Sequence, residues 1–130
     1  MTTVDTNVLL RIIVHDDEQQ AARASAFLDK QERIFVPKTV VLEVEWVLRS
    51  TYKVRRADIL SSIRSFLGVN NVEVEDGPAV AQALFWYEQG MDFADSLHIA
   101  SAGREFAFAT FDAALQRMAR RLEICKVIAL

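Results

Sequence analysis

Four acidic residues stand where carboxylates could take part in chemistry: Asp5, Glu43, Asp95 and Asp112. Together they form a donor set of oxygen atoms, and the chain has only one cysteine and two histidines. Such a set favours Mg²⁺ or Mn²⁺ over zinc. Carboxylates gathered around these cations suit phosphoryl chemistry, in which a metal ion bridges the phosphate and activates a water molecule. The question is whether the fold brings the four together.

Glu43 is the hardest of the four to explain by an ordinary structural role. A helical wheel over residues 39–52 places it between Trp46 and Val47, so we expect Glu43 to be set into an apolar stripe. Glu45 has Arg49 four residues further on, which predicts a surface ion pair. A desolvated carboxylate costs several kcal/mol unless it is paired or protonated. Either a bound cation or an Arg or Lys partner would satisfy Glu43.

The other three acids have structural alternatives as well. Asp5 and Asp112 each precede a predicted helix and are suited to cap it. Asp95 lies in the first turn of a helix, where the helix dipole favours a negative charge. Asp92 stands three residues before Asp95, in a spacing that we interpret as capping. His98 lies one turn after Asp95, and we expect it to be a core or interface histidine.

Short apolar segments alternate with helical ones along the whole chain. Strands are expected in residues 2–5, 33–37, 71–75, 107–110 and 125–129, and helices in residues 7–14, 15–31, 39–52, 55–68, 76–90, 92–106 and 112–123. This alternation predicts an α/β/α sandwich with a central parallel five-stranded sheet flanked by helices. Ligands of such folds bind beyond the carboxyl ends of the strands, where Asp5 and Asp112 follow strands.

Composition limits the class of protein. With 130 residues the chain is expected to form a single domain, residues 1–130. The net charge of −3 argues against a generic basic nucleic-acid coat. Cys125 is the only cysteine, which excludes an intrachain disulfide and predicts a reducing, cytoplasmic location. No apolar run approaches the roughly 18 residues that span a bilayer, so no membrane association is expected.

The segments VDTNVLL, VLEVEWVL, DFADSLHIASA and FATFD follow one another in an order and spacing that resemble the PIN domain family. More narrowly, the chain resembles the VapC-type toxins of bacterial toxin–antitoxin pairs, over essentially its whole length. The resemblance implies a central parallel sheet, an endoribonuclease that depends on Mg²⁺ or Mn²⁺, and RNA as the substrate. It also implies a cognate VapB-type antitoxin whose tail blocks the site, and a homodimer.

The resemblance assigns roles to particular residues. The catalytic quartet would be Asp5, Glu43, Asp95 and Asp112. Asp5 and Asp95 would be the main metal ligands, while Glu43 and Asp112 would hold a further metal ion or the attacking water. Polar neighbours of the first and last acids, namely Thr6, Asn7 and Thr110, would orient the carboxylates.

One departure from the family pattern concerns the second metal ion. Some members have a fifth acid shortly after the last one, and here Ala113, Ala114 and Gln116 occupy that stretch. A second metal ion would then bind weakly or need a substrate phosphate to complete its coordination.

Basic residues offer candidate contacts to RNA phosphates. Arg117, Arg120 and Arg121 lie within about one helical turn, so one helix face could bind phosphates or simply be solvated. Arg11 is a further cation close to Asp5 in the sequence.

Three other classes of protein are alternatives to this one. A phosphorelay receiver domain would need paired acids after the first strand and a lysine ending the fifth, but Lys126 begins the fifth. A haloacid-dehalogenase-type phosphatase would need Asp-x-Asp, and Asn7 stands in the second place. The remaining alternative is a catalytically inactive PIN-fold module that binds RNA or protein. Measuring metal binding by calorimetry would separate such a module from the nuclease.

Overall fold

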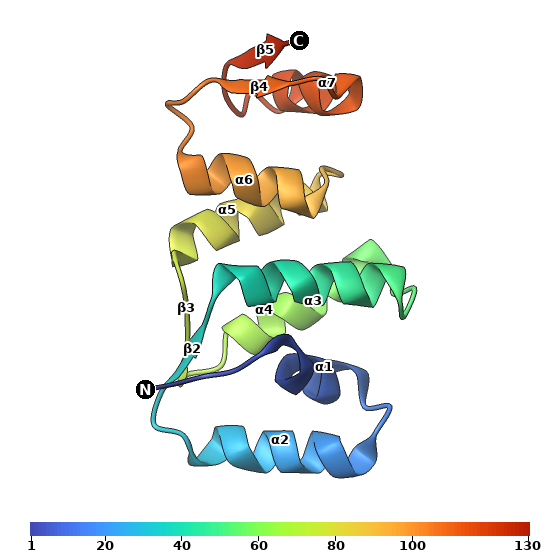
Figure 1. The fold of residues 1–130 in the computed structure, drawn as a ribbon, viewed down its shortest axis with the longest axis vertical. Helices are drawn as coiled ribbons and strands as arrows, with labels where there is room; N and C mark the ends of the chain where they lie inside the picture. Colours follow the sequence, from blue (N-terminus) through green and yellow to red (C-terminus); the bar gives the residue numbers. More distant parts are fainter. The chain divides into compact units, whose positions relative to one another are not determined.

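The computed structural model describes residues 1–130 and divides them into two compact units. Unit 1 is Met1–Gly77 and unit 2 is Pro78–Leu130. Figure 1 follows the chain through both, and each unit is described below by itself.

Unit 1 contains a three-stranded parallel sheet and four helices. In chain order these are β1 (Thr2–Thr3), α1 (Thr6–Val14), α2 (Glu18–Lys30), β2 (Ile34–Val36), α3 (Lys38–Ser50), α4 (Arg56–Leu67) and β3 (Val72–Val74). The sheet order is β1-β2-β3, with Thr2 opposite Ile34 and Ile34 opposite Val72. Helix α1 packs against both α2 and α3 (Figure 1).

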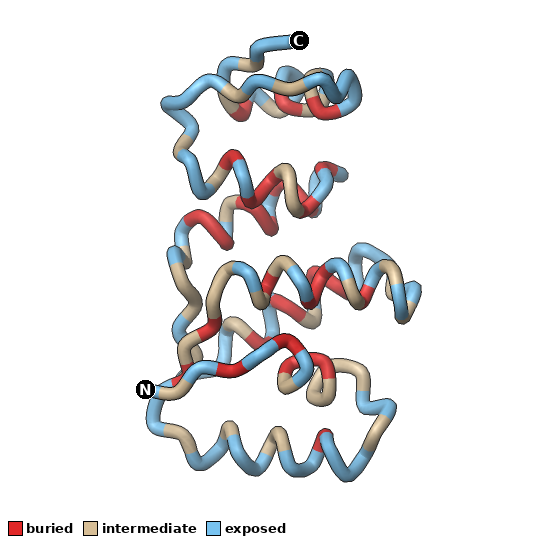
Figure 2. Tube along the Cα trace, viewed as in Figure 1, coloured by how far each residue is buried: buried red, intermediate tan, exposed pale blue.

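Apolar residues at helical spacing hold unit 1 together. Leu9 and Leu10 of α1 are buried, as are Val41 and Leu48 of α3. Helix α2 is different, because Ala21 is its only buried residue and the rest of the helix is exposed or half-buried (Figure 2).

The orientation of α3 contradicts the expected burial of its two glutamates, although the predicted ion pair between Glu45 and Arg49 is present at 2.9 Å. Glu45 is 2% exposed, whereas Glu43 is exposed. The reason is that Val41, Val44 and Leu48 form the stripe that packs into the core, and Glu45 lies on that side of the helix. Glu43 does lie between Trp46 and Val47 on the helical wheel, but these residues are on the side of α3 that faces away from the buried stripe.

Unit 2 begins within α5 (Gly77–Glu88). The remaining elements are α6 (Phe93–Ala102), β4 (Phe108–Thr110), α7 (Ala113–Arg121) and β5 (Val127–Ala129). Strands β4 and β5 pair in parallel, with Phe108 opposite Val127. The buried cluster of this unit consists of Trp86, Met91, Ile99, Leu115, Ala119 and Ile124. Half-buried Cys125 packs against it, and burial raises the pKa of its thiol.

The predicted α/β class is confirmed, and all five predicted strands are present and parallel. They form a three-stranded and a two-stranded sheet, however, in place of the single five-stranded sheet that was expected. Each strand has only two or three residues, so its ladder of hydrogen bonds is short. None of the helices combines the length and apolar character that a membrane crossing requires.

Candidate functional site

A cleft of about 250 Å³ opens on unit 1 where β1 leads into α1. Its lining combines residues of α1 and its cap with residues of α3 and the turn after it: Asp5, Thr6, Asn7, Leu10, Arg11, Glu43, Val47, Thr51 and Tyr52. The structure therefore brings together two acids of the predicted quartet, and both polar residues expected to accompany the first of them.

Asp5 caps α1 and also lines this cleft. Its backbone is extended, and its Oδ1 accepts a hydrogen bond of 3.2 Å from the backbone N–H of Val8. The capping role expected from the sequence is thus confirmed. Asp5 is exposed, so its carboxylate remains accessible to a ligand in the cleft.

Thr6 connects α1 to α3 at the cleft. Its hydroxyl donates a hydrogen bond to Oε1 of Glu43, although the two residues are 37 positions apart. Thr6 is 8% exposed and therefore held firmly, so the bond orients the more exposed carboxylate of Glu43.

A second hydrogen-bonded group forms the basic side of the cleft. Arg11 makes a 2.6 Å ion pair with Asp16 and donates a 3.4 Å hydrogen bond to the hydroxyl of Tyr52. That hydroxyl in turn donates to Asp16 over 2.9 Å. The hydrogen bond with Tyr52 raises the pKa of Arg11, and the charge of Asp16 raises it further. Sequence reasoning missed Tyr52, because only the packing of α3 against α1 brings it here.

Asp112 lies in unit 2 and caps α7. Its Oδ1 accepts hydrogen bonds from the backbone N–H groups of Ala114 and Leu115, at 2.9 and 3.1 Å. Thr110 accepts a 3.0 Å hydrogen bond from the backbone of Asp112, so it holds the turn and not the carboxylate. Gln116, in the stretch where some family members have a fifth acid, donates to the carbonyl of Thr110 over 3.0 Å.

The cap at Asp112 leads to a testable prediction. Replacing Asp112 with alanine should lower the free energy of unfolding by about 1 kcal/mol, because two N–H groups of α7 lose their acceptor. Replacing Asp112 with asparagine should lower the free energy of unfolding by only about 0.3 kcal/mol, because asparagine caps a helix equally well. Urea unfolding followed by circular dichroism compares the two variants, and equal losses would argue against the cap as the source of the stability.

Asp95 lies in the first turn of α6, close to other acids of unit 2. Asp92 caps this helix, as expected, by accepting a 3.0 Å hydrogen bond from the backbone N–H of Asp95. Partial burial raises the pKa of Asp95, and the negative charges of Asp92 and Asp112 raise it further. The nearby His98 opposes this shift. His98 is exposed, so the core alternative is wrong, and the interface alternative stays a prediction.

The four acids offer oxygen donors to a divalent cation, in one pair on each unit. No group of three or more His, Cys, Asp or Glu side chains that could hold a metal ion is present. Asp5 and Glu43 line the unit 1 cleft, while Asp95 and Asp112 belong to unit 2. Each pair supplies carboxylate oxygens without sulfur, and repulsion from Asp112 contributes to the raised pKa of Asp95. These donors fit a hard cation such as Mg²⁺.

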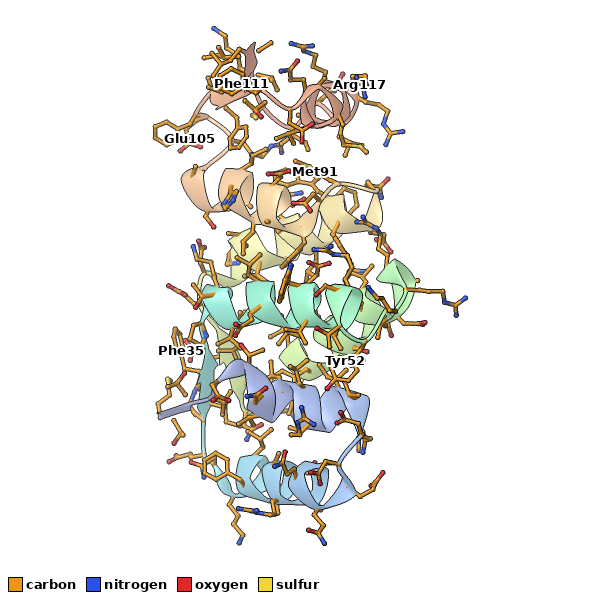
Figure 3. The ribbon with its side chains drawn as sticks, turned by 45° about the vertical axis from the view of Figure 1, so that its right-hand side comes forward. Phe35, Tyr52, Met91, Glu105, Phe111 and Arg117 are labelled. Atoms are coloured by element: carbon orange, nitrogen blue, oxygen red, sulfur yellow. The ribbon has the colours of Figure 1, made fainter.

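The predicted basic face of α7 is exposed at Arg117, Arg120 and Arg121. Arg121 donates hydrogen bonds to the carbonyl of Gln89 at 3.4 Å and to the sulfur of Met118 at 3.0 Å. Figure 3 marks Arg117 on α7.

One protein family and one relative match most of this chain. The sequence pattern of the PIN domain matches residues 2–121. A protein named "VapC ribonuclease" from Aquifex aeolicus (strain VF5) is 29% identical over 92 residues, which cover 68% of each chain.

Two solved structures show weaker likenesses. Mycobacterium tuberculosis VapC20, described as a sarcin-ricin loop cleaving toxin, aligns over 100% of this chain and 89% of its own, with 17% identity and a TM-score of 0.45. VapBC2 from Rickettsia felis, bound to a DNA fragment from its promoter, aligns over 98% and 97%, with 16% identity and a TM-score of 0.39. The match over residues 2–121 establishes that this chain belongs to the PIN domain family.

Proposed function

We propose that this chain is a metal-dependent endoribonuclease of the VapC type, the toxin of a toxin–antitoxin pair. The observation that carries the proposal is the cleft in which Asp5 and Glu43 lie together, with Thr6 hydrogen-bonded to Glu43, in a chain of the PIN domain family. The "VapC ribonuclease" relative supports the choice of RNA as substrate.

The catalytic site in this proposal uses all four acids. Asp5 and Glu43 come from unit 1, and Asp95 and Asp112 come from unit 2. Asp5, Asp95 and Asp112 would hold Mg²⁺ or Mn²⁺. When bound, the cation neutralises charge on the scissile phosphate and lowers the pKa of a water molecule.

The protein's own residues position the reactants. Thr6 holds the carboxylate of Glu43, which accepts a proton from the attacking water. The capping bond from Val8 restricts the carboxylate of Asp5. Asn7 lines the same cleft and has an amide able to bind a phosphate oxygen or a carboxylate. Arg117, Arg120 and Arg121 contact phosphates further along the RNA.

The proposal includes protein partners. A VapB-type antitoxin would block the site, and the toxin would form a homodimer in the cytoplasm. The indole of Trp46, which is 55% exposed on α3, supports a protein–protein surface, because large exposed aromatic side chains are typical of interfaces.

Cleavage of RNA by the purified protein tests the function directly. We expect new 5′ ends at defined positions when total RNA is incubated with the protein and Mg²⁺, and none when EDTA is present. Sequencing of 5′ ends measures this and identifies the target. Cleavage that persists in EDTA would refute metal dependence, and RNA binding without cleavage would indicate a binding module.

A further inference from the structure

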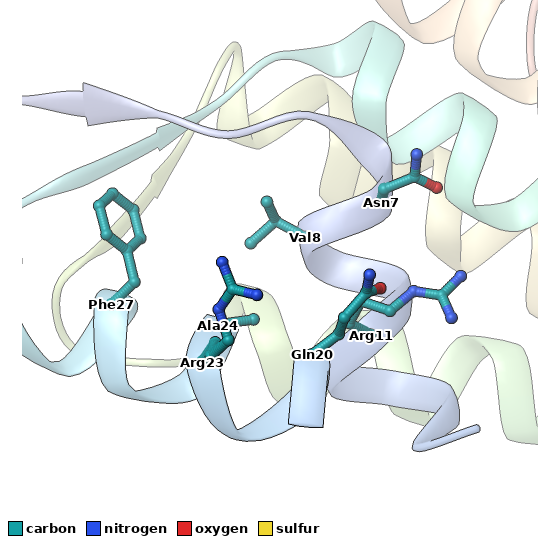
Figure 4. A pocket seen from close by; sticks show the side chains of 7 residues that line it. All are labelled: Asn7, Val8, Arg11, Gln20, Arg23, Ala24 and Phe27. Atoms are coloured by element: carbon teal, nitrogen blue, oxygen red, sulfur yellow. The ribbon is translucent and has the colours of Figure 1, made fainter. Parts of the chain in front are cut away.

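A second hollow on unit 1 adjoins the cleft that contains Asp5 and Glu43. It measures about 420 Å³ and lies between α1 and α2 (Figure 4). We call it the α1–α2 groove, and its lining residues are Asn7, Val8, Arg11, Gln20, Arg23, Ala24 and Phe27. Asn7 and Arg11 also line the cleft, so a chain-like ligand could extend from one hollow into the other.

The charged side chains that line the groove are all basic. Its two charged residues are arginines, and no acidic side chain lines it. Arg11 is held by Asp16 and Tyr52. Arg23 is exposed and forms no ion pair or hydrogen bond with the rest of the chain, and its guanidinium extends from α2 toward α1 (Figure 4). A cation without a partner at the edge of a groove suits an anionic group of a ligand.

The groove also presents an aromatic ring. Phe27 is 42% exposed and lies four residues after Arg23, on the same side of α2. An exposed ring beside an unpaired guanidinium can bind the base and the phosphate of one nucleotide. A base can stack on the ring, and its phosphate can bind the cation.

We propose that the α1–α2 groove binds one nucleotide of single-stranded RNA next to the cleavage site, with Arg23 contacting its phosphate and Phe27 stacking on its base. This inference rests on the proposed function, because it gives the same RNA a second binding position. Arg11, between the two hollows, contacts the phosphate that connects them. A peptide of a protein partner is the competing occupant, and the unpaired guanidinium of Arg23 beside the ring of Phe27 favours RNA.

Fluorescence anisotropy with a labelled single-stranded RNA of mixed sequence tests the groove, in an Asp5→Asn background that prevents cleavage. Phe27→Leu keeps an apolar side chain but removes the ring, so it should weaken binding about tenfold, and Phe27→Trp should preserve it. Arg23→Gln should lower the slope of log K against log salt concentration by about 0.7, because one phosphate contact is lost. Phe27→Leu should leave that slope unchanged.

Arg33→Gln is the matched control. Arg33 is also an exposed arginine of unit 1, but it pairs with Glu73 at 2.6 Å and lies outside both hollows. We expect neither the affinity nor the slope to change. If Arg23→Gln and Phe27→Leu bind RNA like the Asp5→Asn parent, the nucleotide site is refuted and a peptide becomes the better occupant. If the parent itself binds no RNA at low salt, the proposed function fails with it.

Discussion

Replacing Asp5 with asparagine should reduce RNA cleavage at least about a hundredfold while leaving the protein folded. Changes to residues that merely orient a metal ligand already cost up to about a hundredfold, and Asp5 is proposed as a direct ligand. The amide of asparagine is neutral and binds a divalent cation less strongly than a carboxylate. It nevertheless caps a helix as well as aspartate does, so the bond to Val8 survives. Initial cleavage rates and urea unfolding measure the two effects.

Asp17→Asn provides the matched control for this variant. Asp17 caps α2 by accepting a 3.0 Å hydrogen bond from the backbone N–H of Gln20, and it lines neither hollow. The same chemical change there should leave cleavage unaltered. If Asp5→Asn retains cleavage that co-elutes with the protein in gel filtration, Asp5 is not a ligand of the catalytic metal.

Removing the guanidinium of Arg49 should lower the free energy of unfolding by about 2 kcal/mol. Glu45 is buried, with its side chain 3% exposed, and its Oε2 accepts a 2.9 Å hydrogen bond from Arg49. Arg49→Ala leaves this carboxylate in the interior with less compensation. Because the Arg49 side chain is 47% exposed, the loss should stay below that of a fully buried ion pair. Urea unfolding at neutral pH gives the value.

Two further variants distinguish burial from charge as the cause. Arg55→Ala breaks an ion pair at the surface, in which the side chain of Arg55 is 86% exposed and that of Asp58 is 59% exposed. This change should alter the free energy of unfolding by less than about 0.5 kcal/mol. Glu43→Gln should be equally mild, because Glu43 is exposed and glutamine can still accept the bond from Thr6. A loss in Arg49→Ala no greater than in Arg55→Ala would show that other contacts satisfy Glu45.

The local features of this protein could be predicted from the sequence because they depend on neighbours along the chain. Asp5, Asp92 and Asp112 all cap the helices that follow them, as their positions indicated. Strand and helix order followed from the alternation of apolar segments, and this order and four short motifs also carried the resemblance to the PIN domain family.

Contacts between distant segments were decided by tertiary packing. Two apolar stripes of α3 were available on the helical wheel, and only the packing of Val41, Val44 and Leu48 into the core determined that Glu45 is buried while Glu43 faces outward. That rotation places Glu43 against Thr6, a contact across 37 positions that no local pattern contains.

The hollows of unit 1 show the same division between sequence and structure. The sequence by itself determined which residues can bind metal or phosphate, because side-chain chemistry does not depend on the fold. Only the tertiary structure brought Tyr52 to Arg11 and placed Arg23 and Phe27 beside the cleft, since the packing of α1 against α2 and α3 sets these distances. Sequence spacing cannot specify contacts between helices, because the loops that connect them allow many arrangements.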